Sequence, residues 1–126
     1  MGDRILLVED EATTLSALRD YFAHIGYDVD CARARDEAVE RLASTRYPVV
    51  IADLLLSKDG GGAYEGLDVV ERVRRDHPGT RVVVLTACGA ELEPEARRRG
   101  ADCFLEKPQP LARLAEIVRT LCRGRA

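Results

Sequence analysis

Five short apolar runs, separated by segments with helical spacing, constrain the fold of this chain most strongly. Three of the runs are continuous rather than alternating, which is typical of strands buried on both faces of a parallel sheet. The runs lie at residues 5–8, 27–31 (the weakest), 49–52, 82–85 and 103–105. They predict five strands.

Between the runs, apolar residues recur at spacings of three and four, as on the buried face of an amphipathic helix. The first such pattern comprises Leu15, Leu18, Phe22 and Ile25, and Gly26 follows it as a C-cap. Further helices are predicted around residues 34–42, from about residue 66, and from about residue 110. Strands and helices therefore alternate along the chain.

The segment 90–99 is the weakest predicted helix because Pro94 lies inside it. Proline is tolerated in a first turn, so we expect a short helix that begins near Glu93. Its apolar anchors are Leu92 and Ala96, and we expect it to be loosely held. The arginines at 97–99 suit the helix dipole, and a partner-binding patch is the alternative.

This order predicts an α/β fold in which parallel strands with right-handed crossovers form a three-layer sandwich. The length of 126 residues suits one domain, 1–126. Ligands of such sheets sit outside the carboxyl ends of the strands. Polar residues follow four of the runs: Glu9, Asp10 and Glu11 after the first, Asp53 after the third, Thr86 after the fourth, and Lys107 with Pro108 after the fifth.

Three carboxylates that share a pocket repel one another, so the pocket needs a cation. All-oxygen ligands without His or Cys favour a hard ion, Mg²⁺ or alternatively Mn²⁺. A cation and the Lys107 ammonium would let an anionic phosphoryl donor approach Asp53, a type of side chain that accepts phosphoryl groups covalently. Thr86 could donate a hydrogen bond to a phosphoryl oxygen. Taken singly, the same residues are explained as helix caps or surface groups, and only their combination favours a site.

The sequence resembles the receiver domain of two-component response regulators, the family of the chemotaxis regulator. The resemblance is carried by ILLVEDE at 5–11, VIADL at 50–54, VLTA at 84–87 and GADCFLEKP at 100–108. It implies a flavodoxin-like (βα)5 fold with strand order 2-1-3-4-5. It also implies that a sensor histidine kinase, or a phosphotransfer protein, phosphorylates Asp53.

The resemblance further implies roles for individual residues. Metal ligation would come from Glu9, Asp10, Asp53 and the backbone carbonyl of Leu55. Thr86 would move toward the phosphoryl group, Lys107 would pair with it, and Lys107–Pro108 would be a cis peptide. Phe104 would turn inward as Thr86 moves, although ordinary core packing also explains an aromatic residue there. The signal would leave through the fourth helix, fifth strand and fifth helix.

One departure from the family pattern follows the acceptor. Ser57 stands where proline is usual, and residues 58–65, with three consecutive glycines, delay the next helix to about Gly66. We interpret this as an insertion of about five residues that forms a mobile loop. It could influence kinase choice or shield the phosphoryl group, or it could be a tolerated surface insertion.

Other classes fit the sequence less well. A net charge of −3 disfavours nucleic-acid binding, no run approaches a membrane span, and four cysteines without metal spacing suggest reduced thiols in a cytoplasmic protein. An aspartate-nucleophile phosphatase would need an acid where Leu55 stands, so we expect no turnover of a foreign substrate. A flavin or nucleotide binder would need a glycine-rich loop after the first strand. Output would pass to a downstream protein or to an effector domain that has been removed, with a weak homodimer left open.

Overall fold

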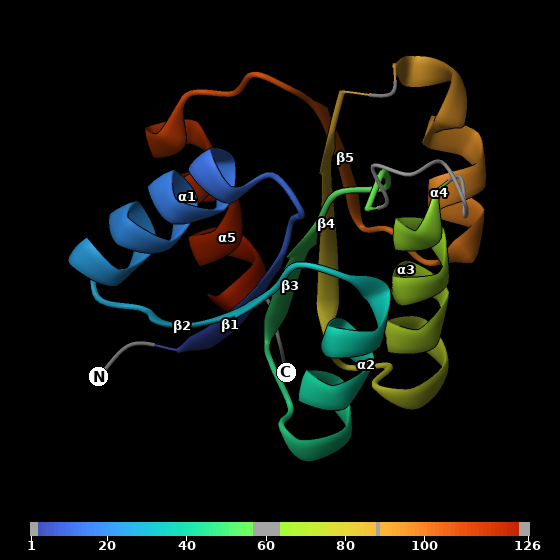
Figure 1. Ribbon diagram of the computed structural model, residues 1–126, viewed down its shortest axis with the longest axis horizontal. Helices are drawn as coiled ribbons and strands as arrows, with labels where there is room; N and C mark the ends of the chain where they lie inside the picture. The colour runs from blue at the N-terminus through green and yellow to red at the C-terminus, as the bar shows by residue number, and fades with distance from the viewer. Residues whose placement is uncertain (1–2, 57–63, 88, 124–126) are drawn as a thin grey trace.

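The computed structural model describes residues 3–56, 64–87 and 89–123. Its helices and strands alternate along the chain as the sequence predicts (Figure 1). They are β1 (Arg4–Val8), α1 (Ala12–His24), β2 (Asp28–Ala32), α2 (Arg35–Ser44), β3 (Val49–Ala52), α3 (Glu65–Asp76), β4 (Arg81–Thr86), the 3-10 turn η1 (Ala90–Leu92), α4 (Glu93–Arg99), β5 (Cys103–Glu106) and α5 (Leu111–Arg123). No helix in these ranges is both long and apolar enough to cross a membrane.

The five strands form one parallel sheet in the order β2-β1-β3-β4-β5. Helices α1 and α5 cover one face, and α2, α3 and α4 cover the other (Figure 1). This confirms the predicted flavodoxin-like (βα)5 sandwich and its strand order. In this arrangement the carboxyl ends of β1, β3, β4 and β5 meet at one edge of the sheet.

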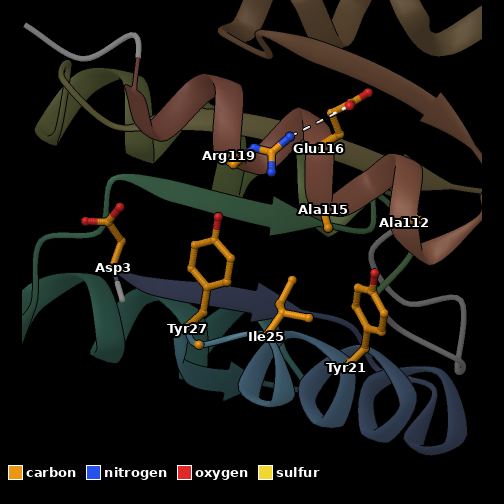
Figure 2. Close-up of a pocket in the computed structure, with 9 residues that line it drawn as sticks. Asp3, Tyr21, Ile25, Tyr27, Ala112, Ala115, Glu116 and Arg119 are labelled. Carbon is orange, nitrogen blue, oxygen red and sulfur yellow. Dashed lines mark ion pairs between the residues drawn. The ribbon is translucent and has the colours of Figure 1, made fainter. Parts of the chain in front are cut away.

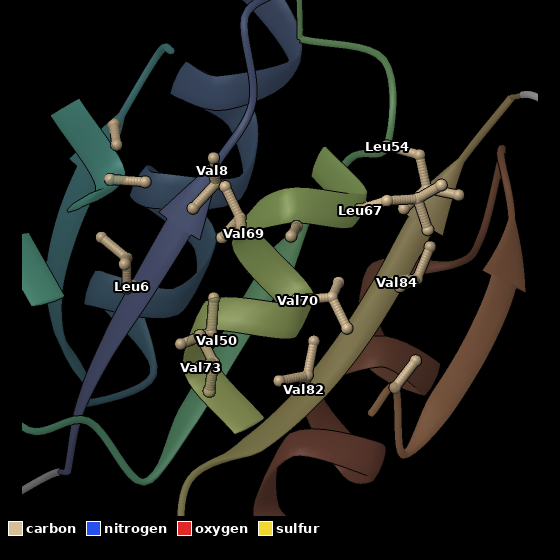
Figure 3. Packing of buried hydrophobic residues seen from close by; sticks show 14 of the residues in the cluster. Leu6, Val8, Val50, Leu54, Leu67, Val69, Val70, Val73, Val82 and Val84 are labelled. Carbon is tan, nitrogen blue, oxygen red and sulfur yellow. The ribbon is translucent and has the colours of Figure 1, made fainter. Parts of the chain in front are cut away.

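Strand side chains alternate between two apolar clusters, as the period of a β-strand requires. Leu6 and Val8 of β1 pack toward α2 and α3, whereas Ile5 and Leu7 pack toward α1 and α5. Figure 3 shows α3 lying across the sheet through Leu67, Val69, Val70 and Val73, which share one apolar cluster with valines of β1, β3 and β4. Because α3 buries this whole stripe, it is firmly fixed to the sheet.

The first helix ends earlier than the apolar spacing suggested. Helix α1 finishes at His24, and Gly26 adopts a φ of +109° just beyond it. Ile25, predicted on the buried face, is instead 43% exposed, because it lies past the last helical residue.

Helix α4 begins at Glu93 and has seven residues, with Pro94 in its first turn, as predicted. Ala96 is its buried residue, and Leu92 packs partly against the same apolar cluster. Gly100, at a φ of +125°, ends the helix. The apolar anchorage of α4 is therefore small.

Candidate functional site

The predicted site residues converge where the strands end. Glu9 follows β1 and donates its N–H to the carbonyl of Ala32 at 3.0 Å, while Asp53 follows β3 and donates its N–H to the carbonyl of Val8 at 2.9 Å. These bonds extend the sheet by one residue and fix both carboxylates at its edge. Glu9 and Asp53 are 3% and 7% exposed, which is rare for acidic residues unless they are paired.

The Asp53 carboxylate is fully engaged by its neighbours. Its Oδ1 accepts a 2.8 Å hydrogen bond from Oγ1 of Thr86 and a 3.1 Å bond from the N–H of Leu55. Its Oδ2 accepts a 2.9 Å bond from Nζ of Lys107. The hydroxyl, the ammonium and the acceptor carboxylate, predicted from three strand ends, are therefore in direct contact.

Lys107 also binds the second buried carboxylate. Its Nζ lies 2.6 Å from Oε1 of Glu9, and Oε2 of Glu9 accepts the N–H of Glu11 at 3.0 Å. The backbone N–H of Lys107 donates to the carbonyl of Thr86 at 2.9 Å, and the Lys107–Pro108 peptide bond is cis. These contacts hold the ammonium between the two carboxylates.

Burial and charge act in opposite directions on this cluster. Burial raises the pKa of the Glu9 carboxyl group, although the hydrogen bonds from Lys107 and from the N–H of Glu11 favour its charged form. Burial disfavours the charged form of Lys107, but its bonds to Glu9 and Asp53 outweigh this and raise its pKa. Lys107 is therefore a cation at neutral pH.

Asp10 completes an acidic cluster. Glu9, Asp10 and Asp53 each offer a carboxylate oxygen, and these oxygens lie within 4.8 Å of one another. One ammonium does not balance three carboxylates, and the donor set contains only oxygen. The cluster therefore fits a hard divalent cation.

The family model for the response regulator receiver domain matches residues 5–119. The chain belongs to this family. The receiver domain is 35% identical to the response regulator protein PilR of Pseudomonas aeruginosa and 32% identical to the response regulator MprA of Mycolicibacterium vanbaalenii. The matches cover 97% and 98% of this chain but 26% and 52% of those proteins, so the chain spans about a quarter to a half of their length.

Solved structures agree with the fold. A CheY-like receiver domain protein from Methanospirillum hungatei JF-1 superposes with a TM-score of 0.90 at 21% identity, over 99% of this chain and 97% of that one. The response regulator TrrA from Thermotoga maritima, solved in complex with Mg²⁺–BeF, gives a TM-score of 0.81 at 28% identity, over 94% and 98% of the two chains. The receiver domain is thus a module of two-component response regulators.

Two predicted residues lie near the site without a contact that defines their role. Leu55 donates its N–H to Asp53 and is 47% exposed, while its carbonyl as a metal ligand stays a prediction. Phe104 is half-buried and packs against the cluster that contains α3. The predicted loop at 57–65 lies outside the described residues except for Tyr64 and Glu65, and Glu65 is already the first residue of α3. The roles proposed for this loop stay predictions.

Sequence reasoning left the role of Glu11 undecided and placed Gly66 at a helix start without foreseeing its packing against the acceptor. Glu11 caps α1 by accepting the N–H groups of Thr13 and Thr14 at 3.4 and 2.7 Å, so its carboxylate serves the helix. Gly66, at the start of α3, donates its N–H to the carbonyl of Leu54 at 2.9 Å. A Cβ on Gly66 would lie 2.0 Å from the carbonyl oxygen of Asp53, so only glycine allows α3 this close to the acceptor.

A hollow away from the acceptor site gathers none of the predicted site residues among its described lining. Its volume is about 440 Å³, and it opens between the end of α1 and α5, close to the amino ends of β1 and β2 (Figure 2). Tyr21, Ile25 and Tyr27 form one wall, and Ala115 and Arg119 belong to the other. The chemistry predicted from sequence therefore belongs to the carboxyl edge, where the charged groups gather.

Proposed function

We propose that this receiver domain is a phosphorylation switch in which Asp53 accepts a phosphoryl group from a phosphohistidine of a sensor histidine kinase or phosphotransfer protein. The observation that carries the proposal is the environment of Asp53: a buried carboxylate bonded to Thr86 and Lys107 beside two more carboxylates. An Asp53 oxygen attacks phosphorus, the phosphorus–nitrogen bond breaks, and the histidine leaves with the bonding electron pair.

Glu9, Asp10, Asp53 and the carbonyl of Leu55 are the residues that would hold Mg²⁺, or Mn²⁺ as an alternative. When bound, the cation would neutralise charge between the acceptor carboxylate and the phosphoryl oxygens. Glu9 and Asp10 therefore serve to orient and balance charge, whereas Asp53 reacts. Two features support this assignment: the donor atoms are all oxygens, and the three carboxylate oxygens lie within 4.8 Å of one another.

Lys107 and Thr86 act on the transferred group. The Lys107 ammonium, now shared between Glu9 and Asp53, would pair with a phosphoryl oxygen. The Thr86 hydroxyl would donate to another oxygen in place of its present bond to Asp53. Movement of Thr86 would let Phe104 turn inward and change the face formed by α4, β5 and α5.

The changed face would recruit a downstream protein or act on an effector domain. Relatives such as PilR and MprA extend well beyond the length matched here, which suits an attached effector. We expect the domain to assist its own phosphorylation and dephosphorylation and not to turn over a foreign substrate.

Acetyl phosphate with Mg²⁺, followed by intact mass, tests the acceptor. We expect one phosphoryl adduct in the wild type, none in Asp53→Asn, and no adduct in the wild type when the metal is chelated. Asp36→Asn is the matched control, because the Asp36 side chain is 94% exposed and lies outside the acidic cluster. An adduct that survives in Asp53→Asn would refute Asp53 as the acceptor.

A further inference from the structure

Helix α4 has little apolar contact with the rest of the molecule and several contacts through charged side chains. It buries Ala96, and Leu92 of the preceding turn η1 packs partly against the same apolar cluster, whereas α3 buries a complete apolar stripe. A helix of seven residues is too short to be stable alone, so its tertiary contacts decide whether it stays in place. Because α4 has few apolar contacts, its polar contacts contribute a larger part of its stability than polar contacts do for α3.

Arg99, the last residue of α4, makes ion pairs with three carboxylates on two helices. Its NH1 lies 3.4 Å from Oδ1 of Asp68 and 3.3 Å from Oε1 of Glu71, both on α3. Its Nε lies 2.7 Å from Oε2 of Glu95, one turn earlier in α4. The bonds from Arg99 and Arg98 lower the pKa of Glu95, so this carboxylate stays charged at neutral pH.

Other contacts also join α3 to its neighbouring helices α4 and α2. Arg74 of α3 donates from NH1 to the carbonyl of Arg98 at 2.8 Å and lies against Gly100, where a Cβ would meet its side chain at 2.8 Å. Asp68 also pairs through Oδ2 with NH1 of Arg35 on α2, at 3.1 Å. Asp68 therefore sits between two arginines, one on each neighbouring helix.

Asp68 lies in the first turns of α3, near the residue of this helix that packs against the acceptor segment. Two residues before it, Gly66 donates its N–H to the carbonyl of Leu54 and leaves no room for a side chain next to the carbonyl of Asp53. A shift of the first turn of α3 thus moves the peptide that follows Asp53. The ion pairs of Arg99 therefore connect the first turns of α3 with the end of α4.

We propose that Arg99, with Asp68, Glu71 and Glu95, forms an electrostatic clamp that couples the position of α4 to the acceptor site through α3. This inference rests on the proposed function of Asp53. In the packing described here, the oxygens of Asp53 and Glu9 are taken by Thr86, Lys107 and backbone N–H groups. In this proposal the clamp favours the packing in which these hydrogen bonds are formed. A ligand at Asp53 must then overcome both the hydrogen bonds and the clamp.

A double-mutant cycle with Asp68→Asn and Arg99→Gln tests the clamp. Arg98→Gln is one matched control, because the Arg98 side chain pairs with Glu95 inside α4, whereas its contact with Arg74 of α3 uses the backbone carbonyl, which the substitution keeps. Arg35→Gln is the other, because it removes the pairs of Arg35 with Asp68 and Asp36 and leaves Arg99 with its carboxylates in place. The two readouts are amide hydrogen exchange in α4 and the apparent affinity for beryllofluoride with Mg²⁺, a phosphoryl mimic.

We expect Arg99→Gln and Asp68→Asn each to speed exchange in α4 and to tighten beryllofluoride binding by about two- to fivefold, the range of one to a few exposed ion pairs. The double variant should match Arg99→Gln, and the controls should leave beryllofluoride affinity at the wild-type value. Additive effects in the double variant, or unchanged affinity in both single variants, would overturn the clamp. A wild type that does not bind beryllofluoride would instead refute the proposed function, and the exchange data would still decide whether the clamp holds α4.

Discussion

Gly66 gives the sharpest test of how α3 supports the acceptor. A Cβ built on Gly66 lies 2.0 Å from the carbonyl oxygen of Asp53, 2.5 Å from Cα of Leu54 and 2.8 Å from the carbonyl carbon of Asp53. All three are backbone atoms, so no flexible side chain can give way. In Gly66→Ala, the first turn of α3 and the Asp53 peptide must separate by about 1 Å before the closest contact becomes tolerable.

Two terms of opposite sign set the stability of Gly66→Ala. Overpacking costs roughly 1–3 kcal/mol, and here about 2–3 kcal/mol because only backbone atoms can give way, while alanine returns about 1 kcal/mol through its better helix propensity. The net loss is therefore about 1–2 kcal/mol, which lowers the Tm of a chain of this length by about 4–8 °C. Thermal unfolding followed by circular dichroism measures it.

The same displacement should slow the chemistry. A reacting group misplaced by about 1 Å can cost 10- to 100-fold in rate, so we expect the rate of phosphorylation by acetyl phosphate to fall by at least about tenfold. Gly79→Ala is the matched control, because a Cβ there meets nothing within 4 Å. A Gly66→Ala protein with the Tm and the rate of Gly79→Ala would refute the close packing of α3 against Asp53.

Two other contacts and one backbone conformation can be tested by single substitutions. Lys107→Met removes the ammonium that competes for Glu9 and Asp53, so the Kd for Mg²⁺ should fall about tenfold by calorimetry; an unchanged or larger Kd contradicts this. Burial and a 2.7 Å bond to Asp30 raise the pKa of Tyr47 to about 12. Its folded-state pKa is above the unfolded value, so its contribution is complete below about pH 10 and is lost as the pH rises toward 12, a loss on the order of 2 kcal/mol. Urea unfolding should show this extra alkaline loss in the wild type and not in Tyr47→Phe. Tyr64, at a φ of +64°, occupies the left-handed region, so Tyr64→Gly should raise the free energy of unfolding by about 1 kcal/mol, and a lower value would argue against backbone strain.

Local patterns were sufficient to predict the fold because each strand and helix carries its own signal. Continuous apolar runs identified the strands, and Pro94 correctly limited the start of α4 to Glu93. The strand order came from resemblance to the family, since no spacing within this chain says which strands are neighbours. Ile25 shows the limit of spacing alone, because a helical pattern does not reveal where the helix ends.

The site depends on contacts that span the chain, so sequence could propose its members but not their pairing. Lys107 was expected to meet a phosphoryl group, and its bond to Glu9 was not foreseen, because these residues are 98 positions apart. Gly66 carries no chemical group that would attract notice. Its importance comes from the distance between α3 and the Asp53 peptide, which only a folded chain defines.

The hydrogen bonds within the cluster of Asp53, Glu9, Thr86 and Lys107 affect how the proposed switch would work. Each buried carboxylate oxygen of Asp53 and Glu9 already accepts a hydrogen bond from the protein. A cation and a phosphoryl group would therefore displace protein contacts, and an unpaired buried group is costly. Thr86 and Lys107 must then find new partners together, because Lys107 donates its N–H to the carbonyl of Thr86 and their strands are paired up to Thr86 and Glu106. Under the proposed function, phosphorylation of Asp53 would therefore move the ends of β4 and β5 together, because this backbone bond joins Thr86 to Lys107.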